Sequence, residues 1–304
     1  MQYVLETDQL TTKYRSAAAL CGLTMRVPKG AIYGLIGRNG AGKTTLIRLV
    51  CGLQNPSGGS YTLFGEKNDS GAIGRSRRRM GAVVENPAIC LDMTAAGNLR
   101  QQYALLGLPS DEGISELLKL VGLSSTGSKK ARNFSLGMRQ RLGIAVALAG
   151  NPDFLLLDEP TNGLDPEGII EIRELILKLN RERGITVLIS SHILGELSKL
   201  ATYYGFVDGG RMIRELSADE LEAECGKRVT AEVSDVRILA RVLDLMKLKY
   251  RVISDSKADI YGEVVASELF AALEKQSCRI LKLTERDESL EGYYMNLFGG
   301  GHNA

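Results

Sequence analysis

A glycine-rich segment, residues 37–44, constrains this chain more than any other feature. It reads Gly-Arg-Asn-Gly-Ala-Gly-Lys-Thr and matches the pattern G-x-x-x-x-G-K-[ST]. The apolar run 31–36 before it predicts a strand, and the pattern from Lys43 to about Cys51 predicts a helix. Glycines let successive backbone N–H groups face an anion, and a helix N-terminus adds positive partial charge. The segment therefore predicts a site for a nucleoside triphosphate.

The side chains of this loop have expected roles. Lys43 is predicted to reach the β- and γ-phosphates, and the Thr44 hydroxyl is predicted to ligate Mg²⁺. The residues expected to hold the nucleotide phosphates are Gly37, Arg38, Asn39, Gly40, Ala41, Gly42, Lys43, Thr44 and Thr45.

Two acidic residues follow a second predicted strand, residues 154–157. Asp158 suits a Mg²⁺ shell because hard cations take oxygen ligands, and Glu159 would face the γ-phosphate as a general base. His192 follows the apolar run 186–189 and is expected to hydrogen-bond the γ-phosphate or the attacking water. A lone histidine is more often structural, but ligands bind just past the strand ends of open parallel sheets. With Lys43, these residues predict triphosphate hydrolysis.

The order of predicted elements indicates the fold class. Strands alternate with helices up to about residue 215, which predicts an α/β domain with a mostly parallel sheet. Helical spacing from about residue 92 to 150 predicts an inserted helical subdomain. The order β-α-β-β-α-β after residue 216 is ferredoxin-like. We expect an ATPase domain over 1–215 and a small α+β accessory domain over 216–304.

A further motif narrows the class of nucleotide-binding protein. Residues 134–141 read Phe-Ser-Leu-Gly-Met-Arg-Gln-Arg. They resemble the signature sequence of ATP-binding-cassette (ABC) ATPases, usually Leu-Ser-Gly-Gly-Gln. Tyr14 resembles the aromatic residue that stacks on adenine in this family, although it could instead be a core aromatic. Residues 162–165, Asn-Gly-Leu-Asp, resemble the loop that follows the two acidic residues in this family. With His192, the motifs span residues 14–192 in the order of the family.

The resemblance implies a fold, a partner and a reaction. It implies a P-loop NTPase cassette with a RecA-like mixed sheet, ATP and Mg²⁺ as ligands, and ATP hydrolysis. In this family two cassettes pack head to tail, so Ser135 and Gly137 would contact the γ-phosphate bound by the other subunit, with the helix N-terminus facing the anion. The partner subunit would be a second copy or a paralogue. Leu136 and Met138 depart from the usual glycine and glutamine.

Glu85 is a second departure from the family pattern. The family generally has glutamine there, in contact with Mg²⁺ and the permease interface, so we expect Glu85 to contact the metal and the nucleotide. In having glutamate at this position, the chain resembles the ATPases of bacitracin- and lantibiotic-type exporters. The ending of residues 289–294, Ser-Leu-Glu-Gly-Tyr-Tyr, resembles that group too. This implies a subunit that drives an ABC-2 type exporter of peptide antibiotics or other drugs. Glu85 could also only cap a turn, and importers share the cassette.

Composition limits the other classes. A net charge of +2 over 304 residues does not indicate nucleic-acid binding. No run approaches the roughly 18 apolar residues of a membrane helix, so a separate permease subunit would span the membrane. Five dispersed cysteines fit reduced thiols in the cytosol. The family resemblance implies a place on the inner face of the cell membrane, bound through the permease. Soluble ABC proteins that act on ribosomes normally carry two cassettes in one chain, and those that act on chromosomes carry a long coiled coil. GTPases carry a guanine-selecting Asn-Lys-x-Asp. This sequence shows none of these features, which disfavours all three classes.

Overall fold

The computed structural model describes residues 2–14, 17–108, 110–225, 228–261, 264–286, 292–294 and 297. The chain divides into two compact units, Met1–Ala218 and Asp219–Ala304. The expected boundary followed residue 215. Residues 289–291 of the ending likened to exporter ATPases lie outside the described residues.

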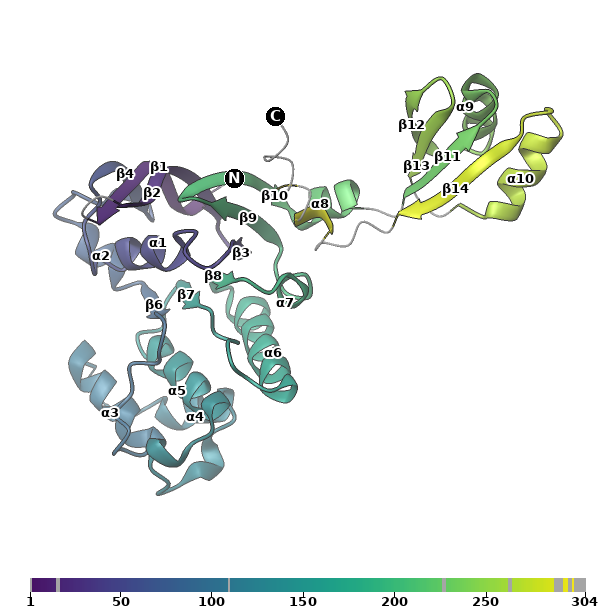
Figure 1. Ribbon diagram of the computed structural model, residues 1–304. Coiled ribbons are helices and arrows are strands. Elements are labelled where there is room, and N and C mark those ends of the chain that lie inside the picture. The colour runs from purple at the N-terminus through teal and green to yellow at the C-terminus, as the bar shows by residue number, and fades with distance from the viewer. Residues whose placement is uncertain are drawn as a thin grey trace. The chain divides into compact units, whose positions relative to one another are not determined.

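A six-stranded sheet forms the centre of the first unit (Figure 1). The strands are β3 (Ile32–Ile36), β6 (Met80–Val83), β7 (Phe154–Asp158), β8 (Thr186–Ser191), β9 (Tyr203–Asp208) and β10 (Arg211–Ser217). Their order is β10-β9-β3-β8-β7-β6, with every neighbouring pair parallel except β10–β9. β3, β7 and β8 are buried throughout, as strands covered on both faces are. The predicted parallel α/β sheet is confirmed.

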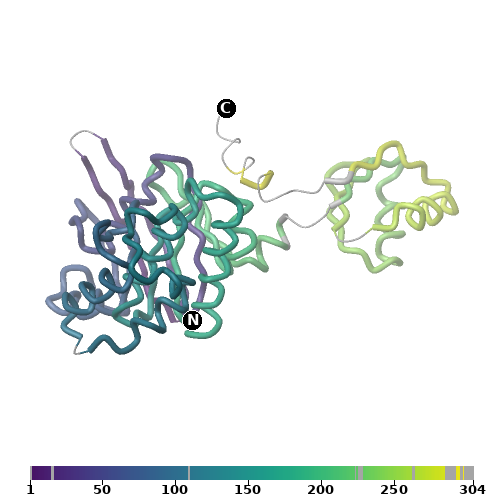
Figure 2. The backbone as a smooth tube through the Cα atoms, turned by 90° about the horizontal axis from the view of Figure 1, so that it is seen from below, coloured from purple at the N-terminus to yellow at the C-terminus, as the bar shows by residue number. Residues whose placement is uncertain are grey.

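A second, antiparallel sheet contains β1 (Tyr3–Tyr14), β2 (Ala17–Pro28), β4 (Gly58–Leu63) and β5 (Glu66–Lys67), in the order β2-β1-β4-β5. In Figure 2 the purple strands β1 and β2 run side by side. The apolar residues within 3–7 by themselves predict only a short strand there. The pairing of β1 with β2 shifts register between Thr7 and Leu10, where Gln9 has a left-handed φ of 47°. Such bulges interrupt the alternation by which strands are predicted.

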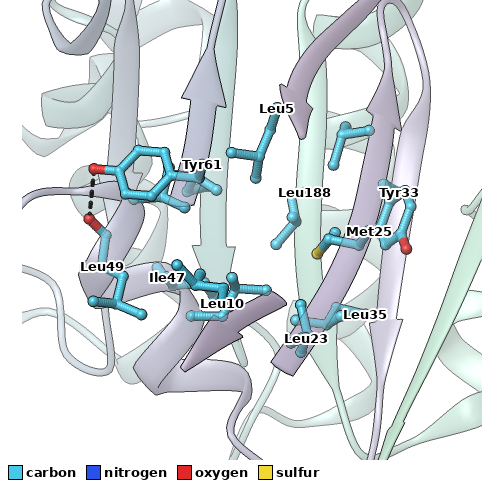
Figure 3. Close-up of a cluster of buried hydrophobic side chains, with 14 of the residues drawn as sticks. Leu5, Leu10, Leu23, Met25, Tyr33, Leu35, Ile47, Leu49, Tyr61 and Leu188 are labelled. Carbon is cyan, nitrogen blue, oxygen red and sulfur yellow. Dashed lines mark hydrogen bonds between the residues drawn. The ribbon is translucent and has the colours of Figure 1, made fainter. Parts of the chain in front are cut away.

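A buried cluster joins these two sheets through the helix that follows the glycine-rich loop, α1 (Lys43–Val50). The Tyr61 hydroxyl donates a hydrogen bond of 3.0 Å to the carbonyl of Leu49 (Figure 3). Full burial of a leucine contributes about 1.5–3 kcal/mol, so the cluster holds α1 firmly. Its labelled members are Leu5, Leu10, Leu23, Met25, Tyr33, Leu35, Ile47, Leu49, Tyr61 and Leu188.

The remaining helices of the first unit pack around the two sheets, with α5 and α6 in contact with the large one and α2 in contact with the antiparallel one. They are α2 (Ile73–Arg77), α3 (Ala95–Leu106), α4 (Ile114–Leu120), α5 (Leu136–Leu148), α6 (Pro166–Arg183) and α7 (Leu194–Leu197), with single 3₁₀ turns at Ser124–Thr126 and Ala131–Asn133. In Figure 1, α3, α4 and α5 gather beyond the β6 edge of the sheet. They lie within residues 92–150. Within the described part of the chain, no helix has the length and apolarity needed to cross a membrane.

The second unit has one four-stranded antiparallel sheet. Its elements are β11 (Arg228–Val233), α9 (Val236–Leu245), β12 (Lys249–Ser254), β13 (Lys257–Tyr261), α10 (Ala266–Glu274) and β14 (Ile280–Arg286), and α8 (Ala218–Cys225) precedes them. The strand order β12-β13-β11-β14 is that of a ferredoxin-like sheet, as the element order predicted. Leu239 and Leu243 of α9 and Leu269 and Leu273 of α10 are fully buried against it.

Glu215 of β10 is a partly buried carboxyl group in the first unit. It accepts hydrogen bonds from the Tyr33 hydroxyl at 2.6 Å and from the backbone N–H of Arg26 at 3.0 Å. Burial raises the pKa of Glu215 above its ordinary value, although both hydrogen bonds act in the opposite direction. Burial, and then the charge of Glu215, raise the pKa of Tyr33 as well.

We expect Glu215→Gln to make the melting temperature less dependent on pH. Because the pKa is higher in the folded state, the stability from this group is fully present below the unfolded pKa and is lost as pH rises through the folded pKa. Glutamine keeps the accepting oxygen but does not ionise. Melting temperatures from about pH 4.5 to 7.5 should therefore favour the variant increasingly as pH rises. A difference that stays constant, as expected for the exposed control Glu182→Gln, would contradict this.

Candidate active site

The glycine-rich loop lies between β3 and α1 and is closely packed against its own chain. A Cβ on Gly37 would lie 2.4 Å from the carbonyl oxygen of Val207, and one on Gly42 would lie 2.6 Å from that of Ala19. Gly42 also has a φ of 106°, which side-chain-bearing residues rarely adopt. Both positions therefore require glycine for steric reasons within the chain itself.

Lys43 extends back beneath this loop. Its ammonium group donates hydrogen bonds to the carbonyl oxygens of Gly37 at 2.7 Å and Arg38 at 3.3 Å. It also lies 3.1 Å from Glu159 Oε1, and its side chain is only 6% exposed. Such a buried cation beside the glycine-rich loop suits an anionic ligand.

Glu159 joins the two other predicted catalytic side chains. Its Oε1 faces Lys43, and its Oε2 lies 2.7 Å from Nδ1 of His192. Glu159 has a left-handed φ of 49°, a strained conformation for a residue other than glycine. Its backbone N–H donates to Ser190, at 2.9 Å to Oγ and 3.2 Å to the carbonyl oxygen. The structure thus brings Lys43, Glu159 and His192 together.

Ser190 is a positioning residue that sequence reasoning missed. Its hydroxyl accepts from Glu159 and donates to Asp158 Oδ1 at 2.7 Å. The reason is the sheet register, in which β8 pairs Ser190 directly with Asp158 of β7. The only sequence signal was its place in Ser-Ser-His, after an apolar run.

Asp158 and Thr44, the residues predicted to ligate Mg²⁺, lie on elements that pack together. Asp158 is 1% exposed at the end of β7, and α1, which begins with Lys43 and Thr44, packs against that strand. A hydroxyl and a carboxylate suit Mg²⁺, which completes its octahedron with water and phosphate oxygens. The described residues contain no cluster of three or more His, Cys, Asp or Glu that could hold a metal by themselves. Thr45, next along α1, is half-buried.

Tyr14 and Glu85 lie outside the Lys43–Glu159–His192 group. Tyr14 is 46% exposed at the end of β1, so it is not a core aromatic, and its hydroxyl bonds to Gln54. Glu85 has a left-handed φ of 58°, a half-exposed side chain and an ion pair of 2.6 Å with Arg48 of α1. Glu85 is thus held by the helix of the phosphate loop.

Ser135 and Gly137 lie at the N-terminus of α5. The Ser135 hydroxyl caps the helix by accepting from the N–H of Met138 at 3.2 Å, and Ser135 is exposed. A Cβ on Gly137 would come no closer than 3.8 Å to any surrounding atom of the chain. In contrast to Gly37 and Gly42, the chain's own packing leaves room for a side chain at position 137.

Comparison with known proteins decides the family. A family model described as ABC transporter matches residues 20–162. The bacitracin transport ATP-binding protein BcrA of Bacillus licheniformis is 39% identical over an alignment that covers 99% of this chain and 99% of that protein. The chain belongs to the ABC transporter family. The lantibiotic transport ATP-binding protein SrtF of Streptococcus pyogenes is 40% identical to this ABC chain, over 72% of it and 93% of the relative.

A solved structure agrees with this assignment. The ATP-binding cassette MJ0796, in a dimeric post-hydrolysis state bound to ADP and Pi, superposes with a TM-score of 0.63 and 26% identity over 70% of this ABC chain and 98% of its own. The predicted P-loop ABC fold is confirmed, and the chain is an ATP-binding subunit and an ATP hydrolase of the ABC type.

Proposed function

We propose that this ABC chain drives export of a peptide antibiotic through a separate membrane permease of the ABC-2 type. The observation that carries the proposal is the full-length similarity to a bacitracin transport ATP-binding protein, which includes the C-terminal unit. A lantibiotic relative, similar over 72% of the chain, also has a peptide antibiotic in its name. The chain would work at the inner face of the cell membrane, bound to the permease.

For the chemistry, the geometry supports a separate role for each of Lys43, Glu159 and His192. Lys43 would exchange its contacts with Gly37 and Arg38 for the β- and γ-phosphates. Glu159 would accept a proton from the attacking water, and His192, 2.7 Å from it, would orient its carboxylate. Thr44 and Asp158 would hold Mg²⁺, which would neutralise phosphate charge.

Other residues would complete the nucleotide site. The loop residues Gly37 to Thr45 would supply N–H groups, and the exposed ring of Tyr14 would stack on the adenine. Glu85 would respond to bound nucleotide through its ion pair with Arg48. Arg48 lies on α1, the helix that begins at the end of the phosphate loop. In the ATP state Glu85 would exchange this weak, exposed ion pair for a contact with the metal.

A second subunit would close the site. Gly137 has no steric reason within its own chain to be glycine, and Ser135 beside it is exposed at a helix N-terminus. Close approach of a phosphate from another subunit would supply that reason. A related cassette forms a dimer with nucleotide products bound. We infer a head-to-tail dimer, of two copies or of one copy with a paralogue, that forms when ATP is bound.

The permease would dock on the helical subdomain. Two pairs of large apolar side chains are exposed, one just before α3 and one at its end, and exposed apolar groups of this size favour a protein contact. They are Leu91, Met93, Leu105 and Leu106, between 40% and 75% exposed.

Co-expression with a permease encoded by a neighbouring gene tests this function. We expect a six-helix permease to co-purify with the chain, and cells carrying both to tolerate more bacitracin than cells carrying either alone. Co-purification without any change in tolerance to bacitracin or lantibiotics would reject the substrate class. Uptake that depends on an external binding protein would reject the direction. No co-purification would reject the permease partner.

We expect Glu85→Gln to keep ATP binding but to change the coupling of hydrolysis to transport. The substitution removes one exposed ion pair with Arg48, which is worth only about 0–1 kcal/mol. Nucleotide affinity should therefore stay within about threefold, while the transport rate per ATP hydrolysed changes. Asp153→Asn, which removes the exposed ion pair of Asp153 with Arg79, is the matched control. Unchanged antibiotic tolerance and transport would contradict the prediction.

A further inference from the structure

Leu136, the departure from the usual signature glycine, makes a specific contact within its own chain. Its Cδ2 lies 3.4 Å from where a Cβ on Gly163 would be. Gly163 belongs to the loop of residues 162–165, which follows the catalytic acids. A reciprocal contact lies beside it, since the Cδ2 of Leu164 is 3.8 Å from where a Cβ on Gly137 would be. Each leucine thus packs over the glycine of the other segment.

Backbone hydrogen bonds connect the loop of residues 162–165 to Glu159. The N–H of Asn162 donates to the carbonyl of Glu159 at 3.1 Å, and the N–H of Leu164 donates to that of Thr161 at 3.2 Å. At the far end Asp165 caps α6 by accepting from the N–H of Gly168 at 3.2 Å. A displacement of the loop is therefore transmitted to the backbone of the catalytic glutamate.

Gly163 makes the Leu136 contact important for the loop. It has a φ of 76°, a conformation in which a side chain is disfavoured, so the loop cannot supply an apolar group of its own at this point. The side chain of Leu136 fills that space, although 44% of the residue stays exposed. With glycine at position 136, this contact of the signature segment with Gly163 would be lost.

We propose that Leu136 is a positioning residue that couples the two ATP sites of the dimer through a single subunit. Glu159 serves the ATP bound by its own phosphate loop, whereas Ser135 and Gly137 complete the site of the partner. Leu136 and the loop of residues 162–165 connect these two groups, so closure of the signature segment on one ATP shifts Glu159 at the other. This inference rests on the proposed head-to-tail dimer.

The test measures the cooperativity of hydrolysis. The Hill coefficient for ATP hydrolysis should approach about 2 in the wild-type dimer and fall to about 1 in Leu136→Ala, with a loss of about fivefold or more in kcat. Leu136→Met, which keeps an apolar side chain of similar length, should keep both the Hill coefficient and kcat at the wild-type values. Leu245→Ala, a control at an 81% exposed leucine, should change neither. Melting temperatures of all variants show whether the fold is intact.

A separate measurement isolates the dimer itself. In the Glu159→Gln background, dimer formation with Mg²⁺ and ATP is measured by sedimentation, with and without the added substitution Leu136→Ala. A normal dimer in both, together with the loss of cooperativity, supports the coupling. If Leu136→Ala hydrolysed ATP with wild-type cooperativity and rate, the proposed coupling would be wrong, but the proposed dimer would not be affected. A monomer with Leu136 present would overturn both proposals.

Discussion

Glu159→Gln should lower the rate of ATP hydrolysis by about 10²–10⁴-fold, the range expected for loss of a general base. The amide keeps the shape of the side chain and still reaches Lys43 and His192, but it accepts no proton from the attacking water. ATP binding should persist, because the phosphate loop is unchanged. The ATP-bound dimer should therefore accumulate, which sizing with Mg²⁺ and ATP and phosphate release together would show.

Two results would contradict this prediction. Hydrolysis within about threefold of the wild-type rate would remove Glu159 from the catalytic role. A variant that stayed monomeric with Mg²⁺ and ATP would remove the ATP-driven dimer. Glu182→Gln, at an exposed position near the end of α6, is the matched control and should behave as wild type.

Lys43→Met should weaken ATP binding and lower hydrolysis by about 10²–10³-fold, the effect typical of losing one donor that stabilises developing charge. Methionine fits the buried space but provides no charge to the phosphates, and it leaves the Glu159 carboxylate without its cation at 3.1 Å. Calorimetric titration with ATP and phosphate release would measure the two effects. Lys29→Met, at an exposed position before β3, is the control.

The Lys43–Glu159 contact allows a sharper version of the experiment. If Lys43→Met acts partly by leaving a charge unpaired, Lys43→Met combined with Glu159→Gln should recover melting temperature but not ATP affinity. Recovery of affinity in the double variant would show that Lys43 acts only through Glu159, against the proposed phosphate contact.

Much of the site could be predicted because its residues are adjacent in sequence. The phosphate loop needs glycines at fixed spacing, and a lysine and threonine at the start of a helix, so Gly42, Lys43 and Thr44 carry their chemistry in the order of the chain. Likewise Asp158 and Glu159 end a buried strand. The ferredoxin-like order of elements in the second unit could also be predicted from the sequence, since each element is short and shows a single hydrophobic periodicity.

The rest depends on neighbours that are distant in sequence. Ser190 joins Asp158 and Glu159 only because β7 and β8 pair in one register. Arg48 meets Glu85 across 37 positions, and β2 was missed because bulges break its alternation. None of these contacts leaves a periodic signal along the chain.

The sequence by itself determined that this chain binds and hydrolyses a nucleoside triphosphate and belongs with ABC ATPases, because local backbone geometry and motif chemistry suffice for that. Only the tertiary structure decided how Lys43, Glu159 and His192 meet, and that Leu136 packs over Gly163. The physical reason is that strand register and side-chain packing bring together groups from separate segments, and their burial depends on the whole fold.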